Sequence, residues 1–283
     1  MRPESDAWRI ADVFDRVEVI TGRLSEPDGL AGPLCDFKPD VVYHLGWFGS
    51  RRADHDDPRQ LAENITDALE LVELAANARA TTWIGLGSQA EHGPTDAVIS
   101  ESTPTRPVTR YGAAKLSAGL MTRDLSAKRS LRHVWLRLVT AYGPADHPSY
   151  LIPYVILNLL RGKRPALTDG FQPGDYLHVT DACMAIREAA VTESCAGTYV
   201  LASGEQRPVR EVALLIRDMI DPHLEIGLGE LVPGLPPLGL RGDPQALELA
   251  TGWSPQVPLA AGLAGCVDWY RQNLTRYARE NTT

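Results

Sequence analysis

Four short apolar runs, at residues 17–24, 40–46, 81–86 and 133–141, recur through the first half of the chain. The second run lies between a proline and a glycine, which are the flanks typical of a buried strand. The third run places Ser88 just after its carboxyl end. We predict that all four runs are strands.

Two longer segments between these runs are predicted to be helices. Residues 58–78 begin with a proline, and their apolar positions keep helical spacing. Residues 109–129 are rich in Ala, Leu, Lys and Met, which favour helix. Strands that alternate with helices indicate a parallel sheet covered on both faces, with ligands bound beyond the carboxyl ends of its strands.

The pattern changes after Pro148, where short strands and helices mix without a regular alternation. We expect helices at 150–160, 181–191, 209–220, 243–251 and 259–278, and short strands at 175–179 and 198–202. The chain is therefore predicted to have a Rossmann-like α/β domain at 1–148 and a smaller mixed α/β lobe at 149–283. The lobe is expected to bind mainly substrate, with some of its segments returning to the main sheet.

Composition narrows the class of protein. The chain has 283 residues and a net charge of −8, without the basic stripe that nucleic-acid binding requires. It contains no apolar run of about 18 residues and no charged-then-apolar leader, so we expect neither a membrane span nor a secretion signal. The four cysteines form no C-x-x-C pair, which favours reduced thiols in a cytoplasmic protein.

Tyr111 and Lys115 are the strongest candidates for chemistry. Their spacing of four places both side chains on one face of the predicted helix, with Lys115 lying over Tyr111. An ammonium close to a phenol favours the phenolate and lowers the tyrosine pKa from its ordinary value of about 10. Such a tyrosine is a general acid/base that exchanges a proton with a sugar hydroxyl or ketone.

Seven motifs in a fixed order resemble the extended short-chain dehydrogenase/reductases, in the group of nucleotide-sugar epimerases, dehydratases and ketoreductases. They are Asp40-Val-Val-Tyr-His-Leu, Asn64, Gly87-Ser88-Gln89-Ala90-Glu91-His92-Gly93, Tyr111-x-x-x-Lys115, Arg137-Leu-Val-Thr-Ala-Tyr-Gly-Pro144, Asp175-Tyr-Leu-His-Val-Thr-Asp181 and Thr251-Gly252-Trp253-x-Pro255. Together they span nearly the whole chain. Each is weak alone, and their shared order makes coincidence improbable.

The resemblance implies roles for particular residues. Ser88 would orient the sugar carbonyl or hydroxyl, Tyr111 would be the acid/base, and Lys115 would lower its pKa and hold the nicotinamide ribose. The cofactor would be NAD or NADP, and no metal is implied. Further cofactor contacts would come from His44, Leu45, Gly46 and Tyr142. The family often dimerises through helices that correspond to 58–78 and 109–129, so we expect a homodimer.

The sequence lacks the glycine-rich strand, turn and helix with which this family opens and which cradles the dinucleotide pyrophosphate. Either the protein starts upstream of Met1 or its sheet is remodelled and poor in cofactor contacts. Arg2 would lie where an arginine accepts an NADP 2′-phosphate, with a solvated arginine as the alternative. The stretch from Gly85 to Ala90 fits G-x-G-x-x-A, but a helix does not follow it, so we reject it as a dinucleotide loop.

Three departures from the family narrow the reaction. Its dehydratases have Thr-Asp-Glu where this chain has Ser88-Gln89-Ala90, so sugar dehydration is not expected and Gln89 is assigned to substrate binding. Arg23 replaces an aspartate near the adenine. Gly174 stands where an arginine commonly binds the substrate diphosphate, and Arg241 is our candidate cation, with an ordinary surface arginine as the alternative.

The other polar residues that we considered are interpreted without a role in metal binding or catalysis. Asp54-His55-Asp56-Asp57 is interpreted as a solvated charge run rather than a metal site. His44 and His178 lie in apolar runs and are interpreted as core histidines rather than catalysts.

The leading hypothesis is a 4-ketoreductase of an NDP-4-keto-6-deoxyhexose that binds a nucleotide sugar. The alternatives are an NDP-sugar 4-epimerase and a degenerate, non-catalytic relative that binds a sugar nucleotide or a partner subunit.

Overall fold

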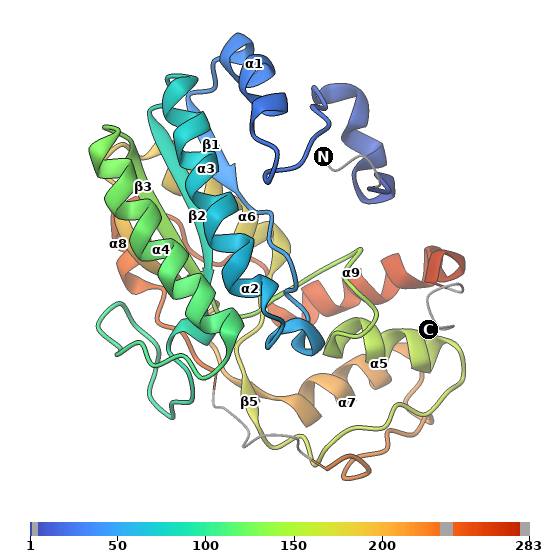
Figure 1. Cartoon of the computed structure of the whole chain (residues 1–283). Coiled ribbons are helices and arrows are strands. Elements are labelled where there is room, and N and C mark those ends of the chain that lie inside the picture. Colours follow the sequence, from blue (N-terminus) through green and yellow to red (C-terminus); the bar gives the residue numbers. More distant parts are fainter. Residues whose placement is uncertain (2–4, 233–239, 278–283) are drawn as a thin grey trace. The chain divides into compact units, whose positions relative to one another are not determined.

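The structure, a computed structural model, describes residue 1, residues 5–232 and residues 240–277 (Figure 1). The chain divides into two units whose segments interleave along the sequence. Unit 1 comprises residues 1–94, 101–138 and 186–199. Unit 2 comprises residues 95–100, 139–185 and 200–283.

A four-stranded sheet runs through unit 1 in the order β1-β2-β3-β7. Its strands are β1 (Val41–His44), β2 (Thr82–Ser88), β3 (Arg132–Leu138) and β7 (Gly197–Leu201). β2 pairs in parallel with both β1 and β3. The predicted parallel α/β sheet of Rossmann-like type is therefore confirmed.

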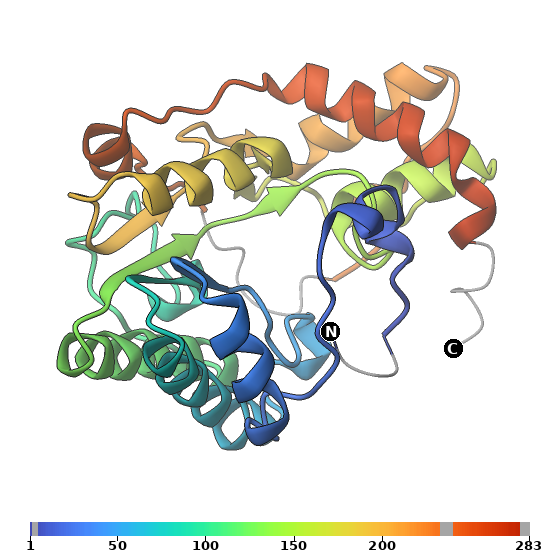
Figure 2. The ribbon, with the colours of Figure 1, turned by 90° about the horizontal axis from the view of Figure 1, so that it is seen from above.

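Two long helices cover one face of this sheet. They are α3 (Asn64–Asn77), which follows the short α2 (Arg59–Ala62), and α4 (Arg110–Lys128). Figure 2 shows α3 and α4 side by side on this face. The predicted helix at 58–78 is thus confirmed, with an interruption at Glu63 between α2 and α3.

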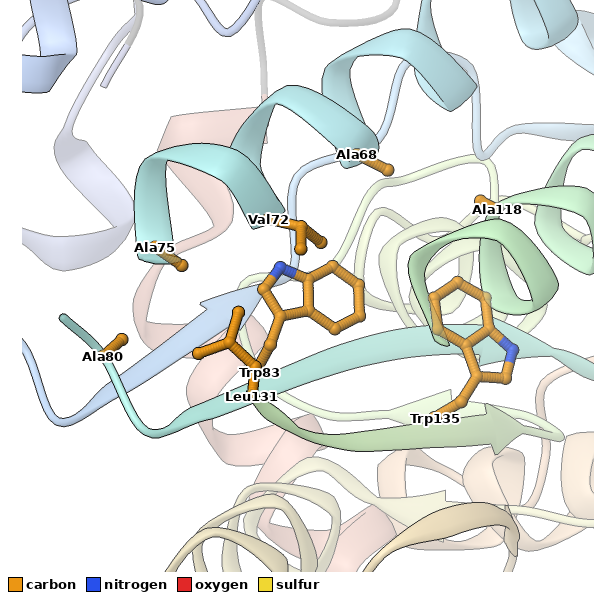
Figure 3. Close-up of a cluster of buried hydrophobic side chains, with 8 residues drawn as sticks. All are labelled: Ala68, Val72, Ala75, Ala80, Trp83, Ala118, Leu131 and Trp135. Atoms are coloured by element: carbon orange, nitrogen blue, oxygen red, sulfur yellow. The ribbon is translucent and has the colours of Figure 1, made fainter. Parts of the chain in front are cut away.

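Two tryptophans fill the space between the sheet and these helices (Figure 3). Trp83 and Trp135 project from β2 and β3, are 0% and 1% exposed, and stack with ring centroids 6.2 Å apart. The helices meet them with small residues, which let the backbones approach closely: Ala68 and Ala75 on α3, and Ala118 on α4. Because each large aromatic buries 150–250 Å², this pair supplies much of the apolar burial that holds α3 and α4 on the sheet.

The predicted strand at 17–24 is wrong. These residues follow the 3-10 helix η1 (Trp8–Arg16), precede α1 (Asp28–Phe37) and are not part of a strand. A strand needs a neighbour that accepts and donates its backbone hydrogen bonds, and no described strand pairs with this segment. An apolar run alone does not supply that neighbour.

The predicted strand at 133–141 is two strands. β3 ends at Leu138, and β4 (Ala141–Tyr142) pairs in parallel with β6 (Leu177–His178) within unit 2. A second two-stranded sheet of unit 2 joins β5 (Pro173–Gly174) and β8 (Arg207–Pro208). Helix α6 (Val179–Val191) begins in unit 2 and ends in unit 1. The other helices in the described part of unit 2 are α5 (Leu151–Leu160), α7 (Val209–Ile220), α8 (Gln245–Thr251), α9 (Leu259–Gln272) and the 3-10 helix η4 (Leu274–Tyr277).

The two aspartates that bound the motif 175–181 hold separate segments of unit 2 together. Asp175 is 0% exposed and accepts backbone N–H groups of Ser203, Gly204 and Gly242 at 2.7, 3.1 and 3.2 Å. The Oδ2 atom of Asp181 accepts the backbone N–H groups of residues 256 and 257. Both carboxylates therefore serve the fold, because each accepts backbone N–H groups from segments that lie far from it in sequence.

None of the helices in the described ranges is long and apolar enough to cross a membrane. The four cysteines are free thiols, with Cys195 and Cys266 buried and Cys35 and Cys183 exposed. Within residues 1, 5–232 and 240–277, the His, Cys, Asp and Glu side chains form no group of three that could hold a metal ion.

Candidate active site

Ser88 ends β2 and begins the 3-10 helix η3 (Gln89–Glu91). Its side chain is buried, and its Oγ accepts the backbone N–H of Ala90 at 3.2 Å. A hydroxyl that accepts one hydrogen bond still has its own hydrogen to donate. Ser88 can therefore donate to an oxygen atom of a ligand at the carboxyl end of β2.

Tyr111 lies in the first turn of α4, where helix N–H groups need partners outside the helix. The Thr109 hydroxyl caps the helix by accepting the Gly112 N–H at 3.1 Å, and the Tyr111 N–H donates to the His55 carbonyl at 2.8 Å. The imidazole of His55 also stacks on the Tyr111 ring, with centroids 4.4 Å apart and planes 5° from parallel. His55 therefore contacts Tyr111 with both its backbone and its ring.

The interpretation of 54–57 as a solvated charge run is wrong for His55. Its neighbour Asp56 is exposed and Asp57 pairs with Arg59, but His55 is half-buried against Tyr111. Residues next to one another in sequence diverge here because the loop turns back on α4.

Lys115 is 5% exposed and lies one helical turn beyond Tyr111. Its Nζ donates to the Leu86 carbonyl at 2.7 Å and lies 3.7 Å from the Trp47 ring centroid, but 6.0 Å from that of Tyr111. The ammonium therefore lies closer to Trp47 than to Tyr111, although the sequence predicted that it would lie over Tyr111. Burial lowers the pKa of Lys115 to about 7, and the charge of Glu91 opposes that change.

Two contacts bring the three predicted catalytic residues to one place. Leu86, the partner of Lys115, lies two residues before Ser88 on β2. On the other side, a Cβ at Gly112 would collide with the Ala90 carbonyl, so the first turn of α4 lies directly against η3. Ser88, Tyr111 and Lys115 therefore converge at the carboxyl end of β2, as expected for a parallel sheet.

The loop after β1, residues 45–57, is fastened by two buried amide side chains, Gln60 and Asn64, which we call the amide pair. Gln60 accepts the Trp47 indole N–H at 3.0 Å and donates to the carbonyls of Gly49 and Asp54. Asn64 accepts the backbone N–H of residue 48 at 2.8 Å and donates to Gln60 at 2.9 Å. The amide pair fixes the loop that brings Trp47 to Lys115 and His55 to Tyr111.

Glu91 is a charged residue at the same strand end whose role sequence reasoning missed. It is 0% exposed, and its carboxylate accepts the Ser88 N–H, the Trp135 indole N–H and the Arg137 Nε–H at 2.9, 2.9 and 2.7 Å. Ser88 and Glu91 together form a capping box on η3. The Ser-x-x-Glu spacing is itself the sequence signature of that motif and could have identified it.

The sequence assigned three residues at the end of β1 to cofactor binding. His44 is 4% exposed, with its ring centroid 5.5 Å from that of Trp83, and burial together with the Lys115 charge lowers its pKa to about 4. It is thus a neutral core histidine at neutral pH. Leu45 is 54% exposed and Gly46 has open space on its Cα, so both can approach a ligand.

Gly85 and Gly87 do not form a phosphate-binding turn, which agrees with our rejection of that motif. Both lie inside β2, and a Cβ at either position would collide with the indole of Trp135. A Cβ at Gly119 of α4 would also reach that indole, at 2.7 Å. These glycines make room for a core tryptophan.

Of the other predicted residues, Gln89 is half-buried in η3, and Arg2 lies outside the described residues. Tyr142 and Arg241 belong to unit 2. The Tyr142 hydroxyl donates to the Leu259 carbonyl at 3.4 Å, and Arg241 is exposed. A Cβ at Gly174 would lie 2.7 Å from the Tyr176 ring, so an arginine there would displace that ring.

Unit 2 also contains a cavity of about 320 Å³. Tyr176, Ser203, Arg207 and the segment 254–259 line it, together with the carboxylates of Glu205 and Glu248. None of the residues that the sequence assigned to substrate or cofactor lines this cavity.

A parallel sheet with Ser88 at the end of its second strand and a Tyr-x-x-x-Lys helix against that end has the architecture of an extended short-chain dehydrogenase/reductase. The NAD dependent epimerase/dehydratase family matches residues 2–202. Since the match covers more than half of the chain, the protein belongs to this family, as its sequence motifs suggested. Members of the family are enzymes that use NAD and act on nucleotide sugars.

Curated relatives agree with this assignment. The chain is 31% identical to the dTDP-glucose 4,6-dehydratase of Neisseria gonorrhoeae, over 95% of this chain and 82% of the relative. It is 26% identical to the UDP-glucose 4-epimerase of Mycolicibacterium smegmatis, over 92% and 85%. The fold resembles that of RMD from Pseudomonas aeruginosa, solved with NADPH, with a TM-score of 0.82 and 22% identity over 94% and 95% of the two chains.

Proposed function

We propose that this protein is a 4-ketoreductase that reduces an NDP-4-keto-6-deoxyhexose with NADH or NADPH. The observation that supports reduction over dehydration is the turn after β2. Gln89 and Ala90 stand there in place of the two acidic residues that the resemblance predicts for a dehydratase. The one carboxylate in the turn, Glu91, is buried and already accepts three hydrogen bonds, so it has no free proton-transfer role.

The residues of the site have distinct tasks in this reaction. Ser88 donates its hydroxyl hydrogen to the oxygen of the 4-keto group and holds the sugar in place. Tyr111 gives a proton to that oxygen as the carbonyl becomes a hydroxyl, and Lys115 supplies positive charge beside it. The nicotinamide cofactor, when bound, supplies the hydride.

The site fits the nicotinamide half of the cofactor. Lys115 uses one of its three N–H groups on Leu86 and faces Trp47 with its charge, so a further N–H is available for the nicotinamide ribose, with Tyr111 beside it. For the pyrophosphate half, the described parts of the chain contain no glycine-rich strand, turn and helix. Within unit 1, we therefore assign Tyr111, Lys115 and the end of β1 to the cofactor.

The remaining expectations are proposals about the whole protein. Residues 1–148 would mainly bind the cofactor and carry the catalytic residues, and residues 149–283 would mainly bind the substrate. Tyr142 would contact the cofactor, and Arg241 would contact the substrate. We expect a cytoplasmic homodimer formed through α2, α3 and α4. In support, α4 exposes Leu120 and Met121, each at 45%, and light scattering of the purified protein would measure the assembly.

An NDP-sugar 4-epimerase is the second candidate, because a UDP-glucose 4-epimerase is among the relatives and the same three side chains would serve it. The two functions differ in redox balance. A ketoreductase consumes one reduced cofactor for each dTDP-4-keto-6-deoxyglucose that it converts. An epimerase interconverts UDP-glucose and UDP-galactose without net consumption, and that result would replace our proposal.

A further inference from the structure

Glu91 is a buried carboxylate of unit 1 that the proposed reaction does not use. Its Oε1 accepts the backbone N–H of Ser88 and the indole N–H of Trp135, both at 2.9 Å. Its Oε2 accepts the Nε–H of Arg137 at 2.7 Å. The carboxylate therefore ties the turn after β2 to two side chains of β3.

This arrangement is stiff for physical reasons. A buried carboxylate is costly unless it is paired and fully hydrogen-bonded, and here Arg137, itself only 9% exposed, supplies the opposite charge. Hydrogen bonds to an ionised acceptor are shorter and stronger than those between neutral groups. Any movement of the Ser88 amide away from Glu91 would leave a charged oxygen less satisfied in a place that water does not reach.

The contact with Ser88 is reciprocal. Ser88 Oγ accepts the Ala90 N–H while Glu91 accepts the Ser88 N–H, so both the backbone and the side chain of Ser88 are restrained. A short 3-10 turn without this carboxylate would be free to rotate the serine hydroxyl away from the sheet edge. The direction of that hydroxyl determines whether it meets a carbonyl oxygen.

We propose that Glu91 is a positioning residue that acts through Ser88, holding its backbone so that its hydroxyl is aimed at the substrate oxygen. This rests on the proposed function only in that Ser88 touches the substrate. Glu91 does not itself contact the reacting atoms. A competing role would be electrostatic, through the ammonium of Lys115, whose pKa the Glu91 charge raises.

The test compares Glu91→Leu with Ser88→Ala, singly and together, in the full chain. Leucine has a similar size but no acceptor atom, so it removes the hydrogen bond to the Ser88 N–H together with those to Trp135 and Arg137. With NADPH and dTDP-4-keto-6-deoxyglucose, we expect Glu91→Leu to lower kcat about 10- to 100-fold and to leave the KM for NADPH within about 2-fold. In the Ser88→Ala background the same change should have no further effect on kcat.

Additive losses in the double variant would overturn the proposal, because they would show that Glu91 acts by another route, such as Lys115. Trp83→Phe serves as the structural control. It removes a buried indole from the same core, and its N–H has no partner among the described residues. Its kcat should stay within about 3-fold of the wild type despite a comparable loss of stability.

Hydrogen exchange gives a readout that needs no turnover. The Ser88 amide should exchange at least about 10-fold faster in Glu91→Leu than in the wild type, and should not change in Trp83→Phe. Unchanged exchange at Ser88 would overturn the proposal even if kcat fell. If the leucine variant does not fold, Glu91→Asp is used instead, because its shorter side chain keeps the charge but moves it away from the Ser88 N–H, and the same changes in kcat and exchange are expected. An inactive wild type with faster Ser88 exchange in the variant would refute the proposed function alone.

Discussion

Two segments flank the Tyr111 and Lys115 pair, and they are held in place by different chemistry. The turn after β2 depends on one buried charge, the carboxylate of Glu91, which is neutralised by Arg137. The loop after β1 depends on the neutral amide pair, Gln60 and Asn64, which bonds mainly to backbone groups and Trp47. Each segment places different groups beside the candidate acid/base.

The difference corresponds to what each segment must do. The turn after β2 presents a hydroxyl, whose hydrogen bond depends on its direction, and a charged acceptor restrains direction strongly. The loop after β1 presents the faces of two rings, Trp47 and His55, whose contacts tolerate small shifts. A second buried charge beside Lys115 would also change the state of its ammonium, and neutral amides avoid that.

The largest effect is expected for Tyr111→Phe, which leaves both flanking segments intact and removes the acid/base. Activity should fall by at least about 1,000-fold, because phenylalanine has no hydroxyl proton to give to the substrate oxygen. Sugar binding and the circular dichroism spectrum should remain near those of the wild type. A variant that kept a tenth of the wild-type rate would show that another residue is the acid.

Lys115→Met tests whether the pKa of Lys115, which lies between the two segments, is lowered in the folded protein. Burial lowers the pKa of Lys115 to about 7, below the ordinary 10.5, so between those values the unfolded chain holds a proton that the folded chain has released. The wild type therefore becomes more stable relative to Lys115→Met as the pH rises from about 7 to 10. Below about pH 7 the difference in unfolding free energy favours the variant most. Between about pH 7 and pH 10 this difference should shift towards the wild type by several kcal/mol, since each unit of pKa shift corresponds to about 1.36 kcal/mol.

Urea unfolding of both proteins across this pH range measures the difference. A stability difference that did not change with pH would mean that Lys115 has an ordinary pKa in the folded state. Lys128→Met, at the exposed end of α4, is the matched control and should show no such dependence.

His55→Ala probes the loop after β1. Loss of the stacked ring should lower kcat about 10-fold, since the Tyr111 ring loses one of the surfaces that orient it. His55→Phe keeps a flat ring and should recover most of the rate, and His223→Ala, at an exposed histidine of unit 2, should change nothing. Failure of the phenylalanine to restore activity would point to a chemical role for the imidazole instead of a positional one.

The smallest effect is expected at Trp135, whose indole N–H donates to Glu91. Gly119→Ala places a methyl group against Trp135 and should destabilise the protein by roughly 1 kcal/mol, although alanine favours helix. Gly265→Ala, in α9 with open space around it, should instead stabilise by up to about 1 kcal/mol. Equal effects at the two positions, measured by thermal unfolding, would contradict the packing of Trp135.

Local signals in the sequence located most of the fold and the residues that meet in the site. The helix-favouring composition of residues 109–129 predicted α4, and the alternation of strands and helices predicted the parallel sheet, because those properties depend on neighbours in sequence. The predicted strand at 17–24 failed because pairing depends on a partner that the run itself does not contain. Ser88, Tyr111 and Lys115 converge because strand ends and helix faces follow from the topology.

The contacts around those residues depended on distant partners and were not predictable in the same way. Nothing in the stretch 54–57 distinguishes His55 from its charged neighbours, and its ring stacks on Tyr111 in a loop that Gln60 on α2 holds through the Asp54 carbonyl. Lys115 was expected over Tyr111, but the Leu86 carbonyl and the Trp47 ring draw its ammonium away. Only Glu91 had a usable sequence signal, the capping-box spacing from Ser88.

The most direct test of the account is the balance between sugar and cofactor in a reaction of the purified protein with dTDP-4-keto-6-deoxyglucose and NADPH or NADH. We predict one mole of reduced cofactor oxidised for each mole of 4-keto sugar reduced, and no oxidation in Tyr111→Phe. Conversion of UDP-glucose to UDP-galactose without net oxidation, or sugar turnover that survives in Tyr111→Phe, would contradict it.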